Sequence, residues 1–265
     1  MFYNAKELQL ELPSMQLDYI TFGSGTRPLV MIQGLNTRSI KGSAHSLAFM
    51  YRVFAKEYKV YLFDRRPDIP EQITVRELAA DIAMTLDALH IANADIFGVS
   101  QGGMIAQYLA IDRPDLVRKL ALAVTLSKNN DLVQSTIDRW VCLAQQGNMK
   151  ELIADMAIRM YSDAYLKRYK LFLPLLTAFQ KPKDLQRFKT LANACLTCNS
   201  YEELQKIKCP VFVLGGKDDK IVGGYASEEI AEKLGCKIHM YEDLGHAAYE
   251  EAKDFNKRIY DFFTQ

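Results

Sequence analysis

Short apolar runs that alternate with amphipathic stretches constrain the fold of this chain more than any other feature. Eight of these runs have the length of β-strands, and several stretches between them place apolar residues at helical spacing. This alternation is typical of a sheet whose faces are covered by helices. The runs expected to be strands are Leu8–Leu12, Leu17–Phe22, Leu29–Ile32, Val60–Phe63, Asp95–Val99, Leu120–Val124, Val211–Leu214 and Lys237–Tyr241.

The first two runs differ from the other six. Leu8–Leu12 and Leu17–Phe22 flank Pro13-Ser14 and alternate apolar with polar residues, which is typical of an antiparallel pair with one exposed face. The later runs are more continuously apolar, as strands covered on both faces are. The sequence therefore predicts an α/β fold with a mostly parallel eight-stranded sheet, helices on both faces and an antiparallel pair at one edge.

Helical periodicity predicts four helices outside the middle of the chain, at Val75–Leu89, Met104–Ile111, Ala226–Leu234 and Ala248–Phe263. Between Ser127 and Tyr201 the rhythm of strands breaks, and helix-forming residues with apolar side chains at helical intervals dominate. We expect residues 127–201 to form a helical cap insertion. The core domain would then comprise residues 1–126 and 202–265.

Composition narrows the class of protein. The 265 residues carry 33 basic and 32 acidic side chains, and this balance gives no electrostatic footprint for nucleic acid or an anionic membrane. No apolar run approaches the roughly 20 residues that a helix needs to span a bilayer. The first residues, Met1–Glu7, lack a basic segment followed by an apolar one. Together with five cysteines, an odd number, this favours a reducing, cytoplasmic location.

Two of the cysteines, Cys195 and Cys198, form a C-x-x-C pattern. A metal or redox site would need a second pair, nearby histidines or a thioredoxin-like context. None of these accompanies the pattern, so we interpret the two residues as reduced thiols on a helix and expect no metal site.

Gly98-Val99-Ser100-Gln101-Gly102 matches the pattern G-x-S-x-G. It follows an apolar strand and opens a helix that should start near Gly103, which is the context of a nucleophile elbow. Such a turn holds its serine in a strained conformation and needs small residues nearby. Gly98, Gly102 and Gly103 supply them, and we predict that Ser100 is a catalytic nucleophile.

A serine hydroxyl needs a base within hydrogen-bond reach and a third group that orients the base. After an elbow of this kind the acid comes first along the chain and the histidine second. His246 follows the last expected strand, where functional groups collect at the carboxyl end of a sheet. The acid should follow the strand before it, and there Asp218 and Asp219 compete. His45, near the start of a helix after the Gly34 loop, could border the pocket.

The reaction also needs hydrogen-bond donors for the oxyanion that develops on the substrate. The backbone N–H of Gln101, next to the nucleophile, is one expected donor. The loop Gln33–Asn36 after the third strand should supply the other, and we assign it to the N–H of Leu35.

Apolar side chains of the expected cap are candidates for the wall of an acyl-binding pocket. The same helical spacing is also typical of helices that pack against the main domain. The candidates are Trp140, Met156, Met160, Phe172, Leu176 and Phe179.

With these residues assembled, the chain resembles the α/β-hydrolase superfamily from Asp18 to Phe263, the insertion excepted. Five landmarks agree in order: the Gly34 loop, Asp64-Arg65, the Ser100 elbow, the Asp219 turn and Gly245-His246. Within the superfamily it looks like the capped group of small esterases, enol-lactonases, carbon–carbon bond hydrolases and cofactor-free haloperoxidases. Ser100 separates it from haloalkane dehalogenases and epoxide hydrolases, which carry aspartate at the elbow.

The resemblance also bears on the acid and on the oxyanion loop. The family's turn reads glycine, two residues, aspartate, one residue and two branched apolar residues, and Gly216–Val222 fits this frame with Asp219 as the acid. One departure is Gln33-Gly34, because most relatives have His-Gly at this point. The expected donor is a backbone amide, so function need not be lost.

These observations predict a serine hydrolase that cleaves a small carboxylic ester, thioester or lactone through an acyl-enzyme. Ser100 would attack, His246 would take and return the proton, and Asp219 would orient His246. We expect a small-molecule acyl substrate and no cofactor. Two alternatives stay open: a non-catalytic ligand-binding protein on the same fold, and an acyltransferase that uses the same triad.

Overall fold

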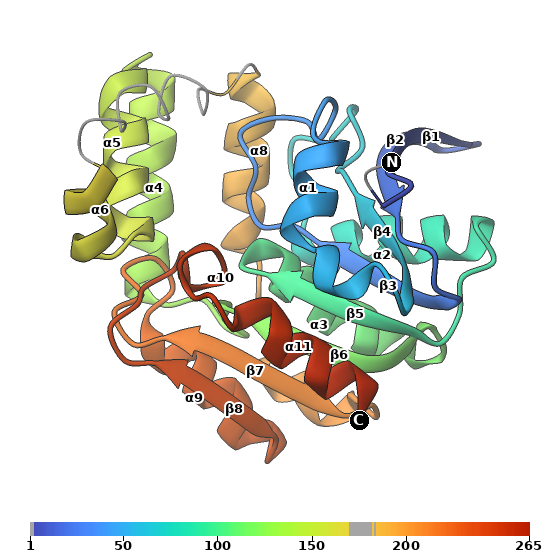
Figure 1. Cartoon of the computed structure of the whole chain (residues 1–265). Coiled ribbons are helices and arrows are strands. Elements are labelled where there is room, and N and C mark those ends of the chain that lie inside the picture. The colour runs from blue at the N-terminus through green and yellow to red at the C-terminus, as the bar shows by residue number, and fades with distance from the viewer. Residues whose placement is uncertain (1–2, 170–181, 183) are drawn as a thin grey trace.

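One eight-stranded sheet forms the centre of the computed structural model, which describes residues 3–169, 182 and 184–265 (Figure 1). All eight runs expected to be strands are strands, and their order in the sheet is β1-β2-β4-β3-β5-β6-β7-β8. The strands are β1 (Lys6–Leu12), β2 (Met15–Phe22), β3 (Arg27–Ile32), β4 (Tyr58–Phe63), β5 (Ala94–Val99), β6 (Val117–Ala123), β7 (Val211–Gly216) and β8 (Lys237–Tyr241).

The direction of the strands confirms the predicted edge. β2 pairs antiparallel with β1 and with β4, and the other neighbouring strands pair in parallel. The carboxyl ends of β3, β5, β7 and β8 therefore lie at the same edge of the sheet. Residues that are far apart in the sequence, in the four loops after these strands, can meet there.

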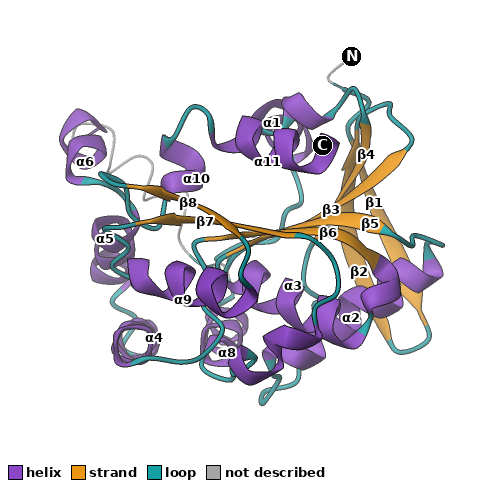
Figure 2. Cartoon of the chain, turned by 90° about the horizontal axis from the view of Figure 1, so that it is seen from below, coloured by secondary structure: helices purple, strands orange, loops and turns teal. Residues whose placement is uncertain are grey.

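Helices cover both faces of the sheet (Figure 2). One face carries α1 (Ala44–Met50) and α11 (Phe255–Thr264), and the other carries α2 (Val75–Ala88), α3 (Gln101–Asp112) and α9 (Gly224–Leu234). Each face has its own apolar cluster, so the central strands β5 and β7 are buried on both sides, as their continuously apolar sequences require. Single turns of 3₁₀-helix lie at Arg52–Phe54 and Pro114–Leu116, and a longer one lies at Tyr201–Lys206.

Helix α2 shows how local sequence fixes these elements. Thr74 and Glu77 form a capping box, in which each side chain accepts a hydrogen bond from the other residue's backbone N–H. Leu78, Ile82 and Leu86 recur at helical spacing and are buried against the sheet. A C-terminal cap is illustrated by α9, which ends at Gly235, whose φ of 59° belongs to the left-handed region.

Four described helices are inserted between β6 and β7: α4 (Asp131–Gln145), α5 (Met149–Met160), α6 (Asp163–Tyr169) and α8 (Leu185–Cys195). We refer to them as the inserted helices. The chain enters and leaves this insertion at one place, since Lys128 bridges to Asn199 and the N–H of Ser200 donates to the carbonyl of Ser127 at 2.7 Å. The inserted helices lie together beyond the carboxyl-end edge of the sheet (Figure 1).

Three expectations about helices need correction. The helix expected over Ala248–Phe263 is two helices, α10 (Ala248–Glu251) and α11, because Ala252 is extended with ψ of 118°. Because of this break, α11 packs Phe255 in the core while α10 lies beside the candidate active site. Helical periodicity alone does not reveal such a change in the direction of the helix axis. The helix after the elbow begins at Gln101, two residues before Gly103.

The third correction concerns the C-x-x-C pair. Cys195 is the last residue of α8, whereas Cys198 lies in the loop beyond it, so the two thiols do not share a helix. All five cysteines are free. In the described part of the chain, no helix combines the length and hydropathy that a membrane crossing requires.

Candidate active site

Ser100 lies in the turn between β5 and α3 with φ of 53° and ψ of −121°, a conformation that is strained for a residue with a side chain. Hydrogen bonds hold it there. The N–H of Ser100 donates to the carbonyl of Ala123 at 2.9 Å, and the hydroxyl of Thr125 donates to the carbonyl of Ser100 at 2.8 Å. The turn presents the Ser100 side chain at the carboxyl edge of the sheet.

The glycines around this serine are needed because backbones approach closely. A Cβ atom on Gly102 would lie 1.9 Å from the carbonyl oxygen of Ile32, and one on Gly98 would lie 2.5 Å from the carbonyl oxygen of Gly102. Real Cβ contacts are never so short, so any side chain at either position would displace the elbow from β3 or from α3.

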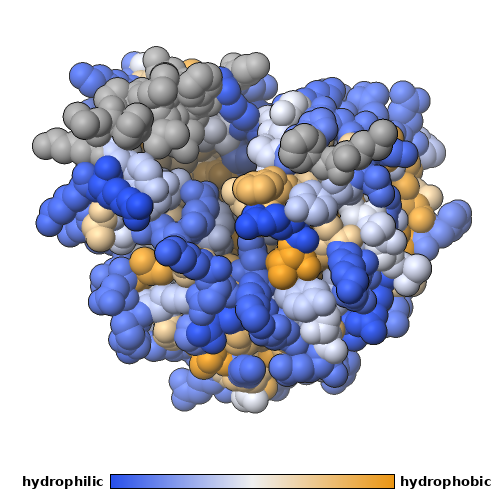
Figure 3. Space-filling view, viewed as in Figure 1, coloured by the Kyte–Doolittle hydropathy of each residue, from blue (hydrophilic) through white to orange (hydrophobic). Residues whose placement is uncertain are grey.

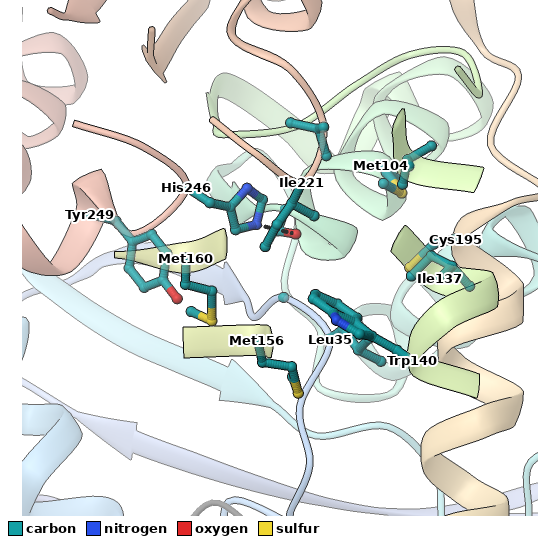
Figure 4. A pocket seen from close by; sticks show the side chains of 14 residues that line it. Leu35, Met104, Ile137, Trp140, Met156, Met160, Cys195, Ile221, His246 and Tyr249 are labelled. Atoms are coloured by element: carbon teal, nitrogen blue, oxygen red, sulfur yellow. Dashed lines mark hydrogen bonds between the residues drawn. The ribbon is translucent and has the colours of Figure 1, made fainter. Parts of the chain in front are cut away.

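A chain of hydrogen bonds connects the three residues expected to form a triad. Nε2 of His246 lies 2.9 Å from Oγ of Ser100 (Figure 4). Nδ1 of His246 lies 2.8 Å from Oδ2 of Asp219. Because an ionised carboxylate can only accept, the network assigns the proton to Nδ1 and leaves Nε2 free to accept from the serine hydroxyl. His246 and Asp219 are 4% and 6% exposed, so bulk water weakens neither contact.

The structure brings Asp219, and not Asp218, to the histidine. Oδ1 of Asp219 accepts hydrogen bonds from the N–H groups of Ile221 and Val222, at 2.8 and 3.0 Å, which fixes the carboxylate while Oδ2 faces His246. Asp218 is exposed, and its backbone N–H donates to the carbonyl of Leu244. His45 is exposed on α1 and is not among the described residues that line the pocket.

The two expected oxyanion donors belong to segments that both adjoin Ser100. Gln101 is the first residue of α3, and its N–H belongs to the first turn, whose donors have no intrahelical acceptor. The Gly34 loop also packs against the nucleophile: a Cβ on Gly34 would lie 3.2 Å from Cβ of Ser100. Leu35, next in this loop, lines the pocket.

A cavity of about 50 Å³ opens beside Ser100 and His246. Three of the predicted wall residues, Trp140, Met156 and Met160, line it (Figure 4). The other three, Phe172, Leu176 and Phe179, lie outside the described residues. In space-filling form the molecule is hollowed between the inserted helices and the sheet domain, with apolar surface inside the hollow (Figure 3).

Seven further residues line this cavity that the sequence did not single out for it. Met104 is one helical turn after Ser100, and Tyr249 is three residues after His246. Their spacing from these two residues could have predicted that they line the pocket. The remaining five come from α4, from the end of α8 and from the acid turn: Val133, Ile137, Cys195, Ile221 and Val222. Burial raises the pKa of the Cys195 thiol to about 11, which keeps it neutral at neutral pH.

Residues 27–253 match the family model described as alpha/beta hydrolase fold. The chain belongs to this family. Among its curated relatives is 3-oxoadipate enol-lactonase 2 of Acinetobacter baylyi, which is 24% identical over an alignment of 261 residues that covers 94% of this chain and 94% of that one. The family and this relative's name indicate a hydrolase.

Solved structures agree on the α/β-hydrolase fold. The enol-lactonase from Burkholderia xenovorans LB400 superposes with a TM-score of 0.85 at 20% identity, covering 97% of this chain and 100% of that one. MGS-M2, an alpha/beta hydrolase enzyme from a Medee basin deep-sea metagenome library, gives a TM-score of 0.85 at 22% identity, with 97% and 98% covered. At such identities these two structures support the fold alone.

In this α/β-hydrolase the pocket wall is tied to the acid turn through Asp155. Its Oδ2 accepts from Nε1 of Trp140 at 2.9 Å and from Nε of Arg159 at 2.8 Å. Arg159 in turn donates from Nη1 to the carbonyl of Lys220, directly after Asp219. The indole of Trp140 is thereby held with its N–H turned to Asp155 and its ring at the cavity.

Within the described residues, no group of three or more His, Cys, Asp or Glu side chains could hold a metal ion.

Proposed function

We propose that this chain is a serine hydrolase that cleaves a small carboxylic ester, thioester or lactone through an acyl-enzyme. The observation that carries the proposal is the hydrogen-bond chain from Ser100 through His246 to Asp219, which ends in an apolar cavity. A nucleophile and a base in contact, with the base oriented by a third group, form the arrangement that activates a serine hydroxyl.

In the first half of the proposed reaction, Oγ of Ser100 attacks the carbonyl carbon of the substrate while Nε2 of His246 takes the hydroxyl proton. The negative charge moves to the carbonyl oxygen, where the N–H groups of Leu35 and Gln101 stabilise it. Collapse of this intermediate breaks the bond to the leaving group, which receives the proton from Nε2. Asp219 stays ionised and stabilises the imidazolium that forms in between.

The second half repeats these steps with water as the nucleophile. His246 takes a proton from the water as its oxygen attacks the acyl carbon, and then returns that proton to Oγ of Ser100. The free acid leaves and the enzyme is restored. The chain's own side chains and backbone amides supply every group in this cycle.

Residues 127–201 act in this proposal as a cap over a core domain of residues 1–126 and 202–265. The cap contributes Trp140, Met156 and Met160 to the wall, and apolar walls favour an apolar acyl group. The name of the curated relative, an enol-lactonase, supports a lactone or ester as the bond that is cleaved.

A fluorophosphonate probe tests the proposal directly. We expect mass spectrometry to find the probe on Ser100, and we expect turnover of chromogenic esters that Ser100→Ala lacks. Labelling that persists in Ser100→Ala would refute the assignment of the nucleophile. Absence of both labelling and turnover would favour a ligand-binding protein on this fold, and acyl transfer to added alcohols in preference to water would favour an acyltransferase.

A further inference from the structure

A buried arginine lies directly behind the proposed oxyanion loop. Arg65, just after β4, is only 4% exposed. Its Nη2 donates a 2.6 Å hydrogen bond to the carbonyl oxygen of Gln33, while its Nε and Nη1 have no hydrogen-bond partner among the described residues. Within the described part of the chain, the guanidinium therefore makes one hydrogen bond, and its acceptor is the residue before Gly34.

The neighbouring arginines each form an ion pair with a carboxylate. Arg66 is paired with Asp81 at 3.2 Å, and Arg187 of α8 is paired with Asp64 at 3.0 Å. Burying a charge that makes a single hydrogen bond is costly, even with the carboxylates of Asp64 and Asp81 nearby. Burial also lowers the pKa of Arg65 to about 10, which still leaves it protonated at neutral pH. A charge kept at this cost suggests that its one hydrogen bond has a function.

The contact fixes a peptide plane next to Ser100. Because the peptide bond is planar, holding the carbonyl of Gln33 also fixes the direction of the Gly34 N–H and restricts the path into Leu35. The same carbonyl is pressed between Arg65 and the elbow, since a Cβ on Gly102 would lie 2.5 Å from it.

Asp64, the residue before Arg65, holds the far side of the same loop. Its Oδ2 accepts from the N–H of Ile40 at 3.0 Å, and its Oδ1 accepts from Nδ2 of Asn36 at 3.3 Å. Two consecutive residues at the end of β4 thus hold the loop on both sides of Leu35. The loop carries no regular secondary structure between β3 and α1, so these side chains replace the backbone hydrogen bonds that would otherwise define it.

We propose that Arg65 is a positioning residue that aims the N–H of Leu35 at the developing oxyanion by holding the carbonyl of Gln33. This inference rests on the proposed serine-hydrolase function. It also offers an account of how the loop keeps its shape with glutamine at position 33, since the contact uses a backbone oxygen and not the side chain at that position.

The test compares Arg65→Met, which keeps the apolar stem but loses the donor, with Arg65→Lys and with Arg66→Met as a matched control. Loss of an oxyanion donor lowers kcat by about 10²–10³-fold in serine hydrolases, so we expect Arg65→Met to lose about 10²-fold in kcat. KM should change little, because the donors act mainly in the transition state. Binding of an alkylboronic acid, which forms a tetrahedral adduct with the serine, should weaken by a similar factor.

Two further readouts separate positioning from a general loss of structure. Arg65→Lys, which keeps a charged donor, should recover part of kcat, and millimolar guanidinium should raise the activity of Arg65→Ala but not that of Arg66→Met. If Arg65→Met does not fold, the lysine variant and the guanidinium rescue still decide the question.

The outcomes distinguish this inference from the proposed function. Wild-type protein that neither turns over esters nor reacts with a fluorophosphonate refutes both. Active wild-type protein with Arg65 variants that match Arg66→Met refutes the role of Arg65 alone. The same holds if kcat falls only in parallel with thermal stability, with boronic acid binding unchanged and no rescue by guanidinium.

Discussion

The backbone N–H of Ala247 donates a 2.8 Å hydrogen bond to the carbonyl oxygen of Met160. Ala247 directly follows His246, and Met160 ends α5 and lines the cavity. Two more hydrogen bonds join the same two segments, because the N–H and the hydroxyl of Ser162 donate to Glu251 at 2.9 and 2.5 Å. We refer to the contacts of Met160 and Ser162 with Ala247 and Glu251 as the seam. The loop that carries the proposed base is therefore fastened to the wall of the pocket, and a shift of the inserted helices would reach His246.

Glu251→Ala should loosen this seam. Hydrogen bonds to a charged group contribute about 1.5–3 kcal/mol each when they are shielded from water, so we expect the free energy of unfolding to fall by about 1–3 kcal/mol in urea titrations. The control is Glu242→Ala, which removes a carboxylate that is 69% exposed and paired with Lys217, a pair worth at most about 1 kcal/mol. Equal effects of the two variants would show that the seam contributes nothing beyond a surface ion pair.

The apolar wall of the cavity predicts a preference for acyl length. Each methylene buried in an apolar pocket contributes up to about 0.8 kcal/mol, so kcat/KM should rise from acetyl esters to medium acyl chains. Met160→Ala enlarges the cavity and should move the optimum to longer chains. Ile158→Ala on the same helix removes a side chain that is 57% exposed and should leave the profile unchanged. A profile that is flat or falls from two to six carbons would contradict the acyl pocket.

The cysteines should differ in their reactivity with iodoacetamide. The thiolate is the reactive form, and burial raises the pKa of Cys195 to about 11. At pH 8 we expect the exposed Cys142 to be alkylated and Cys195 to remain unmodified, as measured by peptide mass spectrometry. Protein unfolded in urea provides the control, in which both should react. Rapid modification of Cys195 in the folded protein would show that the pocket admits water and activates this thiol.

The parts of this molecule that the sequence predicts are those with a local signal. All eight strands could be located because each is a short apolar run between turns. The elbow could be located because Gly98, Ser100 and Gly102 occur in one pentapeptide between a strand and a helix. The order of acid and histidine after the serine then left only a few residues to choose from, and the structure brings Asp219 and His246 into contact with each other.

What the sequence does not predict depends on contacts between distant residues. The bond from Arg65 to Gln33 joins side chain and backbone 32 positions apart, and Asp155 reaches Trp140 across 15 positions. No periodicity encodes such pairs. The break between α10 and α11 is similar. Ala252 is a good helix former, yet its backbone is extended where the chain passes from the contacts of Ala247 and Glu251 with the inserted helices to Phe255 in the core.

Substitution at the acid turn gives the sharpest test of the proposed mechanism. In Asp219→Asn the amide oxygen can still accept from Ile221 and Val222, but its NH₂ group then faces Nδ1 of His246. Two donors cannot face each other, so the histidine turns to the other tautomer and Nε2 no longer accepts the serine proton. A well-studied triad loses roughly 10⁴ in kcat on this change, and we expect a loss of that order. Asp218→Asn, at the exposed neighbouring position, should stay within about tenfold of wild type, because its hydrogen bond to Leu244 uses the backbone N–H, which the substitution keeps. Thermal melts must first show that both variants fold equally. The opposite ranking of the two kcat values would transfer the role of the acid to Asp218.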